Sequence, residues 1–348
     1  MSEGKIKSFV RAAAFIGVMT FTCAAMAADK VRVAMTAGLA DAPMIVAMER
    51  GYFKQENIEI EKVVFASASQ AVVPLANKDI DVAGGSISAA LYNAIERGVK
   101  IKAVADRSHT EHGIPYITVF VRQDLISSGR FKTLADLKGM KVAIIAKGIT
   151  VHALLEAGLK SAGLGMSDVE IVYMDYPNQV LALRNKAIDA TLMGEPFATQ
   201  LVEEGTGARV MNTNDFFPNY VITVFLYGET LLVDRREVGE RFMRALMRGM
   251  RDYNDALDDK GFIAPQNADI VAALEREFRV PTRQILGMYS HSVDPNGVVN
   301  AKSVQIDWSY LIENNQISGR VKPDDIMDSS FAEKALKALG PYKPRKTN

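Results

Sequence analysis

The chain has 348 residues, of which 48% are hydrophobic and 24% charged, and its acidic and basic residues balance to a formal net charge of zero. This length predicts about two domains with a large apolar core, and the neutral charge argues against nucleic acid as a partner. Cys23 is the only cysteine, so the chain can form no internal disulfide and no metal site built from several cysteines.

The first 27 residues have the pattern of a secretory signal peptide. Lys5, Lys7 and Arg11 precede the apolar stretch 12–23, and residues 25–27 (AMA) place small side chains at the two positions that a signal peptidase reads. The apolar stretch is shorter than the roughly 20 residues that span a bilayer. We therefore expect cleavage after residue 27 rather than a membrane anchor.

Export to the periplasm is the expectation that follows. Residues 20–22 (TFT) match a lipoprotein site poorly, so lipid anchoring at Cys23 is not expected. The cleaved segment carries three basic residues and one acidic residue, so its removal leaves a net charge of −2. It also removes the only thiol, which excludes a cysteine nucleophile from the mature chain.

From Lys30 onward, short apolar strands alternate with helices. In the first part, strands are predicted at 31–35, 58–65, 80–83 and 99–105, and helices at 42–50, 70–77 and 88–97. In the second part, strands are predicted at 116–122, 141–145, 169–174, 188–192 and 209–211, with a capped helical turn at 133–137 and helices at 151–161, 179–186 and 197–204. A long strand at 220–227 then precedes a mostly helical end, which includes helices at 238–257 and 267–278.

Strand–helix alternation with short connections predicts parallel βαβ units and hence an α/β fold. Two similar halves adjoin without a linker rich in Pro, Gly or Ser, and the strand at 220–227 lies where the chain can cross back. This order predicts two lobes joined by a hinge with two crossovers. The predicted divisions are a signal peptide at 1–27, lobe 1 at 28–112 and 220–342, lobe 2 at 113–219, and a polar tail at 343–348.

Four segments carry a resemblance to a known family. They are AMERGYFKQENI at 47–58, KDIDVAGG at 78–85, TLADLKGMKV at 133–142, and AIDA at 187–190 with Glu195-Pro196. In order and spacing they resemble the ABC-transporter solute-binding proteins that serve nitrate, taurine, aliphatic sulfonates and thiamine-pyrimidine precursors. The resemblance extends from about residue 31 to about residue 257.

The resemblance implies a type II periplasmic-binding-protein fold, with two doubly wound lobes and the first lobe built from both chain ends. It also implies a monomeric receptor that binds a small molecule by hinge closure, needs no cofactor, and delivers its ligand to an ABC permease and ATPase. A pyrimidine-synthesising enzyme shares the resemblance but uses a cysteine-rich motif, so we do not expect an enzyme here. A module that senses a ligand for a membrane receptor stays open as an alternative.

The ligand site is predicted from a topological rule, since doubly wound sheets bind ligands beyond the carboxyl ends of their strands. This rule, with the side-chain chemistry of the histidines and tyrosines nearby, nominates the following contacts: Gly38, Leu39, Asp41, Ser67, Ser69, Gly85, Ser86, His112, Tyr116, Lys147, Gly148, Thr150, His152, Tyr176 and Glu195.

Two ligand classes are compatible with these residues. Ser69, Ser86 and Thr150 lie at or near helix N-termini, which attract anions, and Lys147 adds a positive charge, so a small sulfonate- or carboxylate-like anion is expected. Each hydroxyl can instead simply cap its own helix. The carboxylates and the tyrosines leave a pyrimidine-like or other nitrogenous heterocycle as the alternative.

A metal site is not expected. The segment 109–112 (HTEH) contains two histidines and a glutamate, but its spacing is not that of a zinc protease and no further ligand can be nominated. We interpret this segment as a polar hinge loop before the first crossover.

Overall fold

The structure is a computed structural model that describes residues 27–344 apart from 37, 66–67, 112–113, 115, 214–216, 218 and 259. The predicted signal peptide lies outside the described residues except for Ala27. Within the described part of the chain, no helix is long and apolar enough to cross a membrane.

The first sheet combines strands from the beginning of the chain with one returning strand. Its strands are β1 (Asp29–Met35), β2 (Ile58–Val64), β3 (Val82–Gly85), β4 (Ile101–His109) and β10 (Val221–Gly228), in the order β2-β1-β3-β10-β4. β1 runs parallel to β2 and β3, whereas β10 runs antiparallel to β3 and β4. The helical elements that connect these strands are η1 (Leu39–Asp41), α1 (Ala42–Glu49), α2 (Tyr52–Gln55), η2 (Ala68–Ala71), α3 (Val72–Ala76) and α4 (Ala89–Glu96).

The second sheet is built from the middle of the chain and has the same kind of topology. Its strands are β5 (Thr118–Arg122), β6 (Lys141–Ile144), β7 (Glu170–Tyr173), β8 (Ala190–Met193) and β9 (Gly207–Asn212), in the order β7-β6-β8-β5-β9. β6 is parallel to β7 and β8, and β5 is antiparallel to β8 and β9. The helices of this part are α5 (Gln123–Ser127), α6 (Thr150–Ser161), α7 (Tyr176–Arg184) and α8 (Phe197–Glu203).

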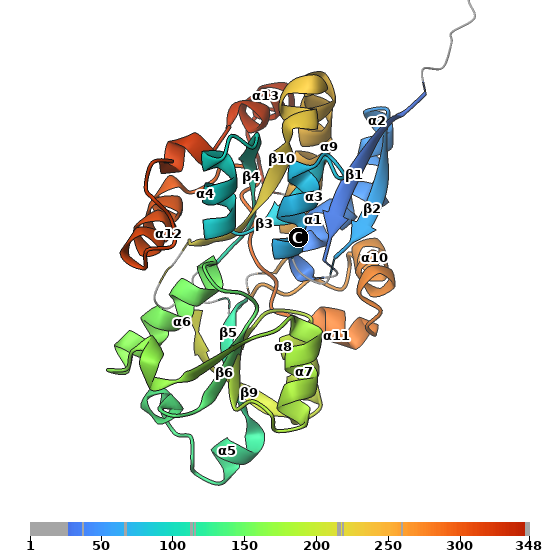
Figure 1. Cartoon of the computed structure of the whole chain (residues 1–348). Coiled ribbons are helices and arrows are strands. Elements are labelled where there is room, and N and C mark those ends of the chain that lie inside the picture. The colour runs from blue at the N-terminus through green and yellow to red at the C-terminus, as the bar shows by residue number, and fades with distance from the viewer. Residues whose placement is uncertain are drawn as a thin grey trace, which may run out of the picture.

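After β10 the chain is helical and packs mainly on the first sheet (Figure 1). The helices are α9 (Arg236–Asp255), α10 (Ala268–Phe278), α11 (Thr282–Gly287), α12 (Ala301–Glu313) and α13 (Ser330–Leu339). α9 buries one face, including Phe242, Leu246 and Met250. A Cβ atom on Gly249 would lie 2.4 Å from the carbonyl oxygen of Pro43 and 2.6 Å from the Cβ of Ala47, so this glycine lets α9 pack closely on α1.

The chain passes between the two sheets through two neighbouring crossover segments, one after β4 and one before β10. The Thr110 amide donates to the Tyr220 carbonyl over 2.9 Å, and the Tyr220 amide donates to the Thr110 hydroxyl over 2.9 Å. The predicted lobe limits at 112/113 and 219/220 fall within these crossovers and stay predictions. Figure 1 shows the two sheets one above the other, with the crossovers between them.

One predicted boundary differs in a way that matters for the site. The fourth strand was expected to end at Ala105, but β4 continues to His109. β10 pairs with β4 from Ile101 to His109, and the backbone hydrogen bonds of this partner keep the polar residues after Ala105 in the strand.

Candidate functional site

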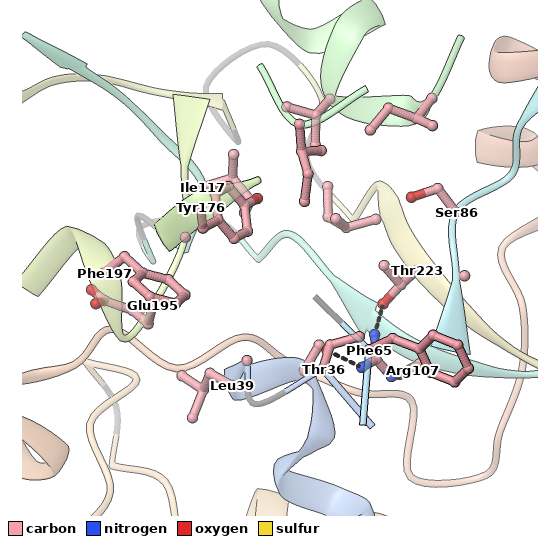
Figure 2. Close-up of a pocket in the computed structure, with 18 of the residues that line it drawn as sticks. Thr36, Leu39, Phe65, Ser86, Arg107, Ile117, Tyr176, Glu195, Phe197 and Thr223 are labelled. Carbon is pink, nitrogen blue, oxygen red and sulfur yellow. Dashed lines mark hydrogen bonds between the residues drawn. The ribbon is translucent and has the colours of Figure 1, made fainter. Parts of the chain in front are cut away.

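A cavity of about 460 Å³ lies between the two sheets, and both sheets contribute to its wall. On the side of the first sheet it is lined by residues of the β1–α1 loop, the β3–α4 loop, β4 and β10. On the side of the second sheet it is lined by residues near the start of β5 and by the loops that lead into α6, α7 and α8. In Figure 2, Arg107 and Thr223 lie on one side of the cavity, and Tyr176, Glu195 and Phe197 on the other.

Seven of the nominated residues line this cavity: Gly38, Leu39, Gly85, Ser86, Tyr116, Tyr176 and Glu195. They come from loops at the carboxyl ends of strands, except Tyr116, which precedes β5. Ser67 and His112 lie outside the described residues, and for Ser69 only the backbone, in η2, is described.

The nominated residues near the start of α6 do not line the cavity, and two of them, Gly148 and Thr150, bond instead to the other half of the chain. The Thr150 hydroxyl donates to Asp307 of α12 over 3.0 Å, and the Gly148 carbonyl accepts from the Ala89 amide over 3.1 Å. His152 accepts from the Gly148 amide through Nδ1 over 3.3 Å, and burial lowers its pKa. Lys147 is exposed and lies outside the cavity wall.

The cation that does line the cavity is Arg107, which the sequence analysis missed. Its side chain is 2% exposed, although β4 is an edge strand of the first sheet. Nη1 donates to the Thr223 hydroxyl over 3.2 Å, and Nη2 lies 2.5 Å from Asp41 Oδ1. The sequence does show an arginine shortly after an apolar strand. The strand was predicted to end at residue 105, two residues before Arg107, so the arginine was not assigned to the sheet.

Gly84 makes the position of Arg107 possible. A Cβ atom on this glycine would lie 2.5 Å from both Cζ and Nε of the guanidinium group, closer than van der Waals contact allows. The glycine pair at 84–85 therefore has a packing role that its sequence, which spells no nucleotide or hydrolase motif, did not reveal.

Asp41, which was nominated as a ligand contact, lies behind Arg107 and does not line the cavity. Oδ2 accepts from the Thr36 amide over 2.7 Å and from the Thr36 hydroxyl over 3.1 Å, while Oδ1 is paired with Arg107. Both oxygens are therefore engaged within the protein, and the side chain is 2% exposed.

Glu195 lines the cavity, but its carboxylate is also fully engaged. Oε2 accepts from the Thr199 amide over 2.9 Å, and Oε1 accepts from the Thr199 hydroxyl over 2.9 Å and lies 2.5 Å from Arg209 Nη2. Burial raises the pKa of this carboxyl, and Arg209 together with the Thr199 hydrogen bonds opposes that rise. The Glu195 carbonyl accepts from the Leu39 amide over 3.3 Å, so the residue also connects the two halves of the chain.

The rest of the wall is largely apolar and aromatic, with a few free hydroxyl groups. The Tyr176 and Phe197 rings are 5.6 Å apart, and Phe65 and Ile117 also line the cavity. Burial raises the pKa of Tyr176 to about 12, so its hydroxyl stays neutral at physiological pH. Neither this hydroxyl nor that of Ser86 bonds to another described residue, so both are available to a ligand.

Two of the helix N-termini beside the cavity, those of α4 and α7, have a side-chain cap, whereas that of α6 has none. Ser88, the N-cap of α4, accepts from the Leu91 amide over 3.2 Å. Asp175, the N-cap of α7, accepts from the Asn178 amide over 3.0 Å. These caps satisfy amides that an anion would otherwise bind, and the carboxylate of Asp175 offsets the partial positive charge of its helix.

No metal centre is found in the part of the chain that the structure describes, since no three His, Cys, Asp or Glu side chains there are grouped so as to hold an ion. His109, the first residue of the segment HTEH, bonds to Asp106 through Nδ1 over 2.7 Å.

Comparison with solved structures defines the class of fold. The ligand-binding component of an ABC-type import system from Staphylococcus aureus aligns with a TM-score of 0.73 at 16% identity, over 88% of this chain and 99% of that one. The periplasmic nitrate-binding protein of Synechocystis PCC 6803 aligns with a TM-score of 0.73 at 17% identity, over 92% of each chain. A desulfurization enzyme aligns with a TM-score of 0.65 at 15% identity, over 89% of this chain and 99% of that one. The predicted type II periplasmic-binding-protein fold is thus confirmed.

The sequence places the chain more narrowly. Residues 24–271 match the NMT1-like family, and the chain belongs to that family. A relative from Brucella abortus (strain 2308), which carries the provisional name of a binding protein, is 26% identical over 229 residues. That match spans 65% of this chain and 65% of the relative's length. The family resemblance deduced from the sequence motifs is confirmed.

Proposed function

We propose that this protein is the solute-binding receptor of an ABC importer and that it captures a small organic molecule in the cavity between its two sheets. The observation that carries this proposal is the cavity itself, which is walled by both halves of a hinged chain. Its volume of about 460 Å³ suits a ligand of metabolite size. The S. aureus import component and the nitrate-binding protein, which share the fold, are named for this kind of role.

Hinge closure is the proposed mechanism. The two crossovers are the covalent links between the sheets, and ligand contacts from both sides would stabilise the closed arrangement. A permease and an ATPase at the membrane would then recognise the closed, liganded receptor. In this proposal the mature protein acts in the periplasm as a monomer, after cleavage of the segment 1–27.

The cavity wall supports a ligand with a sizeable apolar body. Rings and branched side chains make up most of it, and the free hydroxyls of Ser86 and Tyr176 offer a few hydrogen bonds. Of the two ligand classes expected from the sequence, the heterocycle-like class has the better support here. The anion-like class loses the contribution of Lys147, which is outside the wall, and that of the helix N-termini already capped by Ser88 and Asp175.

Native mass spectrometry of freshly purified protein tests the proposal. We expect a co-purified small molecule, and we expect that adding it back to stripped protein raises the melting temperature and reduces the radius of gyration. If neither a cellular extract nor a broad panel of metabolites changes either quantity, the receptor function is contradicted.

The same ligand distinguishes the receptor function from two alternatives, an enzyme and a sensing module. Because a desulfurization enzyme shares the fold, the recovered ligand should be incubated with the protein and analysed for turnover. The receptor proposal expects the ligand back unchanged. Capture of a histidine kinase rather than an ABC permease by the liganded protein would favour a sensing role.

A further inference from the structure

Each charged group at the cavity is neutralised by the protein itself. Among the described residues of the wall, Arg107 and Glu195 are the only charged ones. Arg107 is paired with Asp41, and Glu195 is paired with Arg209, each over 2.5 Å. The described wall and the partners behind it therefore carry no uncompensated charge.

The Asp41–Arg107 pair is fixed in place from both ends. Asp41 accepts hydrogen bonds from the Thr36 amide and hydroxyl. Arg107 donates to the Thr223 hydroxyl and packs directly against Gly84, which has no side chain and so leaves room for the guanidinium group. Both partners are 2% exposed. Separating such a pair leaves a buried charge alone, which is strongly unfavourable, so a ligand would not displace Asp41 easily.

An anionic ligand bound to Arg107 would share the guanidinium group with the carboxylate of Asp41, which is bonded to it from behind. Like charges that share one partner repel each other, and an anion also loses its hydration on entering an apolar cavity. A neutral ligand has neither cost and can still accept hydrogen bonds from hydroxyl groups in the wall.

We propose that Asp41 is a specificity-determining residue that acts through Arg107: by cancelling its charge, Asp41 makes the cavity select small organic molecules without net charge over anions of the same shape. This inference rests on the proposed receptor function, since it assigns the charge of the ligand that the same cavity takes. Asp41 has this effect without lining the cavity.

A pair of probes with nearly the same shape tests the selection. The probes are 2-naphthamide, which is neutral at pH 7, and 2-naphthoate, which is an anion. Isothermal titration calorimetry should give the wild-type protein an affinity for 2-naphthamide at least tenfold higher than for 2-naphthoate. In Asp41→Asn, which frees the charge of Arg107 at similar volume, the ratio should shift by at least tenfold toward 2-naphthoate. The matched control is Asp269→Asn, which changes an exposed carboxylate of α10 and should keep the wild-type ratio.

The double variant Asp41→Asn/Arg107→Gln removes both charges and leaves no buried charge unpaired. It therefore tests the inference even if the single variant does not fold. It should keep the wild-type preference for 2-naphthamide, because its cavity is again neutral. A tenfold loss of 2-naphthoate affinity in the double variant relative to wild type would mean that Arg107 binds anions despite Asp41, which overturns the inference.

Three further results would also overturn it: a wild-type preference for 2-naphthoate, an unchanged ratio in Asp41→Asn, or no binding of either probe to wild type. The receptor function survives all of these if the co-purified molecule still binds, so the two proposals fail separately.

Discussion

At the scale of single residues, the site depends on buried ion pairs whose partners are far apart in the sequence. Arg107 and Asp41 are 66 residues apart, and Arg209 and Glu195 are 14 apart. Each pair holds a loop of the cavity against a strand of the sheet behind it. Such pairs add little net stability, but losing one partner is costly because the other charge stays buried.

The Glu195–Arg209 pair gives a direct test of this asymmetry. We expect Arg209→Met to lower the free energy of unfolding by about 3 kcal/mol or more, because Glu195 is fully buried and would keep an unpaired carboxylate. Urea denaturation measures the change. Arg276→Met, at an ion pair with Glu49 whose arginine is 60% exposed, is the control and should cost less than about 1 kcal/mol. Equal losses in the two variants would contradict the prediction.

A substitution at Ser86 tests whether the ligand binds in this cavity. Figure 2 shows this side chain at the cavity, and it is partly exposed there. Ser86→Trp should fill part of the cavity and weaken binding of the co-purified ligand at least tenfold, as measured by calorimetry. Ser167→Trp adds the same side chain at an exposed turn and should leave binding unchanged. Tight binding by Ser86→Trp would place the ligand elsewhere.

At the scale of secondary-structure elements, the contact of α6 with α12 connects the second half of the chain to the C-terminal helices. The Thr150 hydroxyl at the start of α6 donates to one oxygen of Asp307, and the Tyr220 hydroxyl donates to the other over 2.7 Å. Asp307 is buried and has no cation among these partners. Burial raises its pKa from 3.8 to about 7.

This pKa predicts a pH dependence of stability. Since the folded carboxyl holds its proton more tightly than the unfolded one, its contribution is complete below pH 4 and is lost as the pH rises through about 7. The loss corresponds to about 4 kcal/mol. Chemical denaturation from pH 4 to pH 8 should therefore show a steeper decline for wild type than for Asp307→Asn. Parallel curves for the two proteins would show that Asp307 is ionised in the fold.

At the scale of the whole molecule, the structure shows the two halves in contact on both sides of the cavity. On one side Gly148, just before α6, bonds to α4 and Thr150 of α6 bonds to α12. On the other side the Glu195 loop meets Leu39 and α11, where Gln284 donates to the Pro196 carbonyl over 3.0 Å. Figure 1 shows α11 beside α8 and α12 near α6. The hydrogen bonds among these contacts can break and re-form when lobes separate and close.

Closure can be followed by fluorescence transfer between the two halves. Val73 in α3 and Leu181 in α7 are 65% and 51% exposed, so both can be changed to labelled cysteines in the chain from residue 28 onward, which lacks Cys23. We expect Thr150→Val to lower the transfer efficiency, because it removes a contact that holds the halves together, and we expect the co-purified ligand to restore it. Thr206→Val, between α8 and β9, is the matched control. No difference between these variants would mean that the α6–α12 contact does not hold the lobes closed.

Much of this architecture could be predicted from local patterns. Apolar alternation and helix-ending glycines placed most strands and helices, and the rule on strand ends located loops that do meet at the cavity. Arg107 was missed because β4 extends to His109 only through pairing with β10, more than 100 residues away in sequence. Lys147 was nominated for its positive charge and its place after a strand, and a solvated surface lysine fits the same pattern, so only the fold could show that it is exposed.

The sequence by itself determined the α/β class, the order of the elements and the family, because these depend on periodicity and on motifs that are local in the chain. The tertiary structure alone decided which charges face the cavity and which are cancelled. Pairing of Asp41 with Arg107 and of Thr150 with Asp307 depends on distances between segments that only the packed sheets and helices bring together.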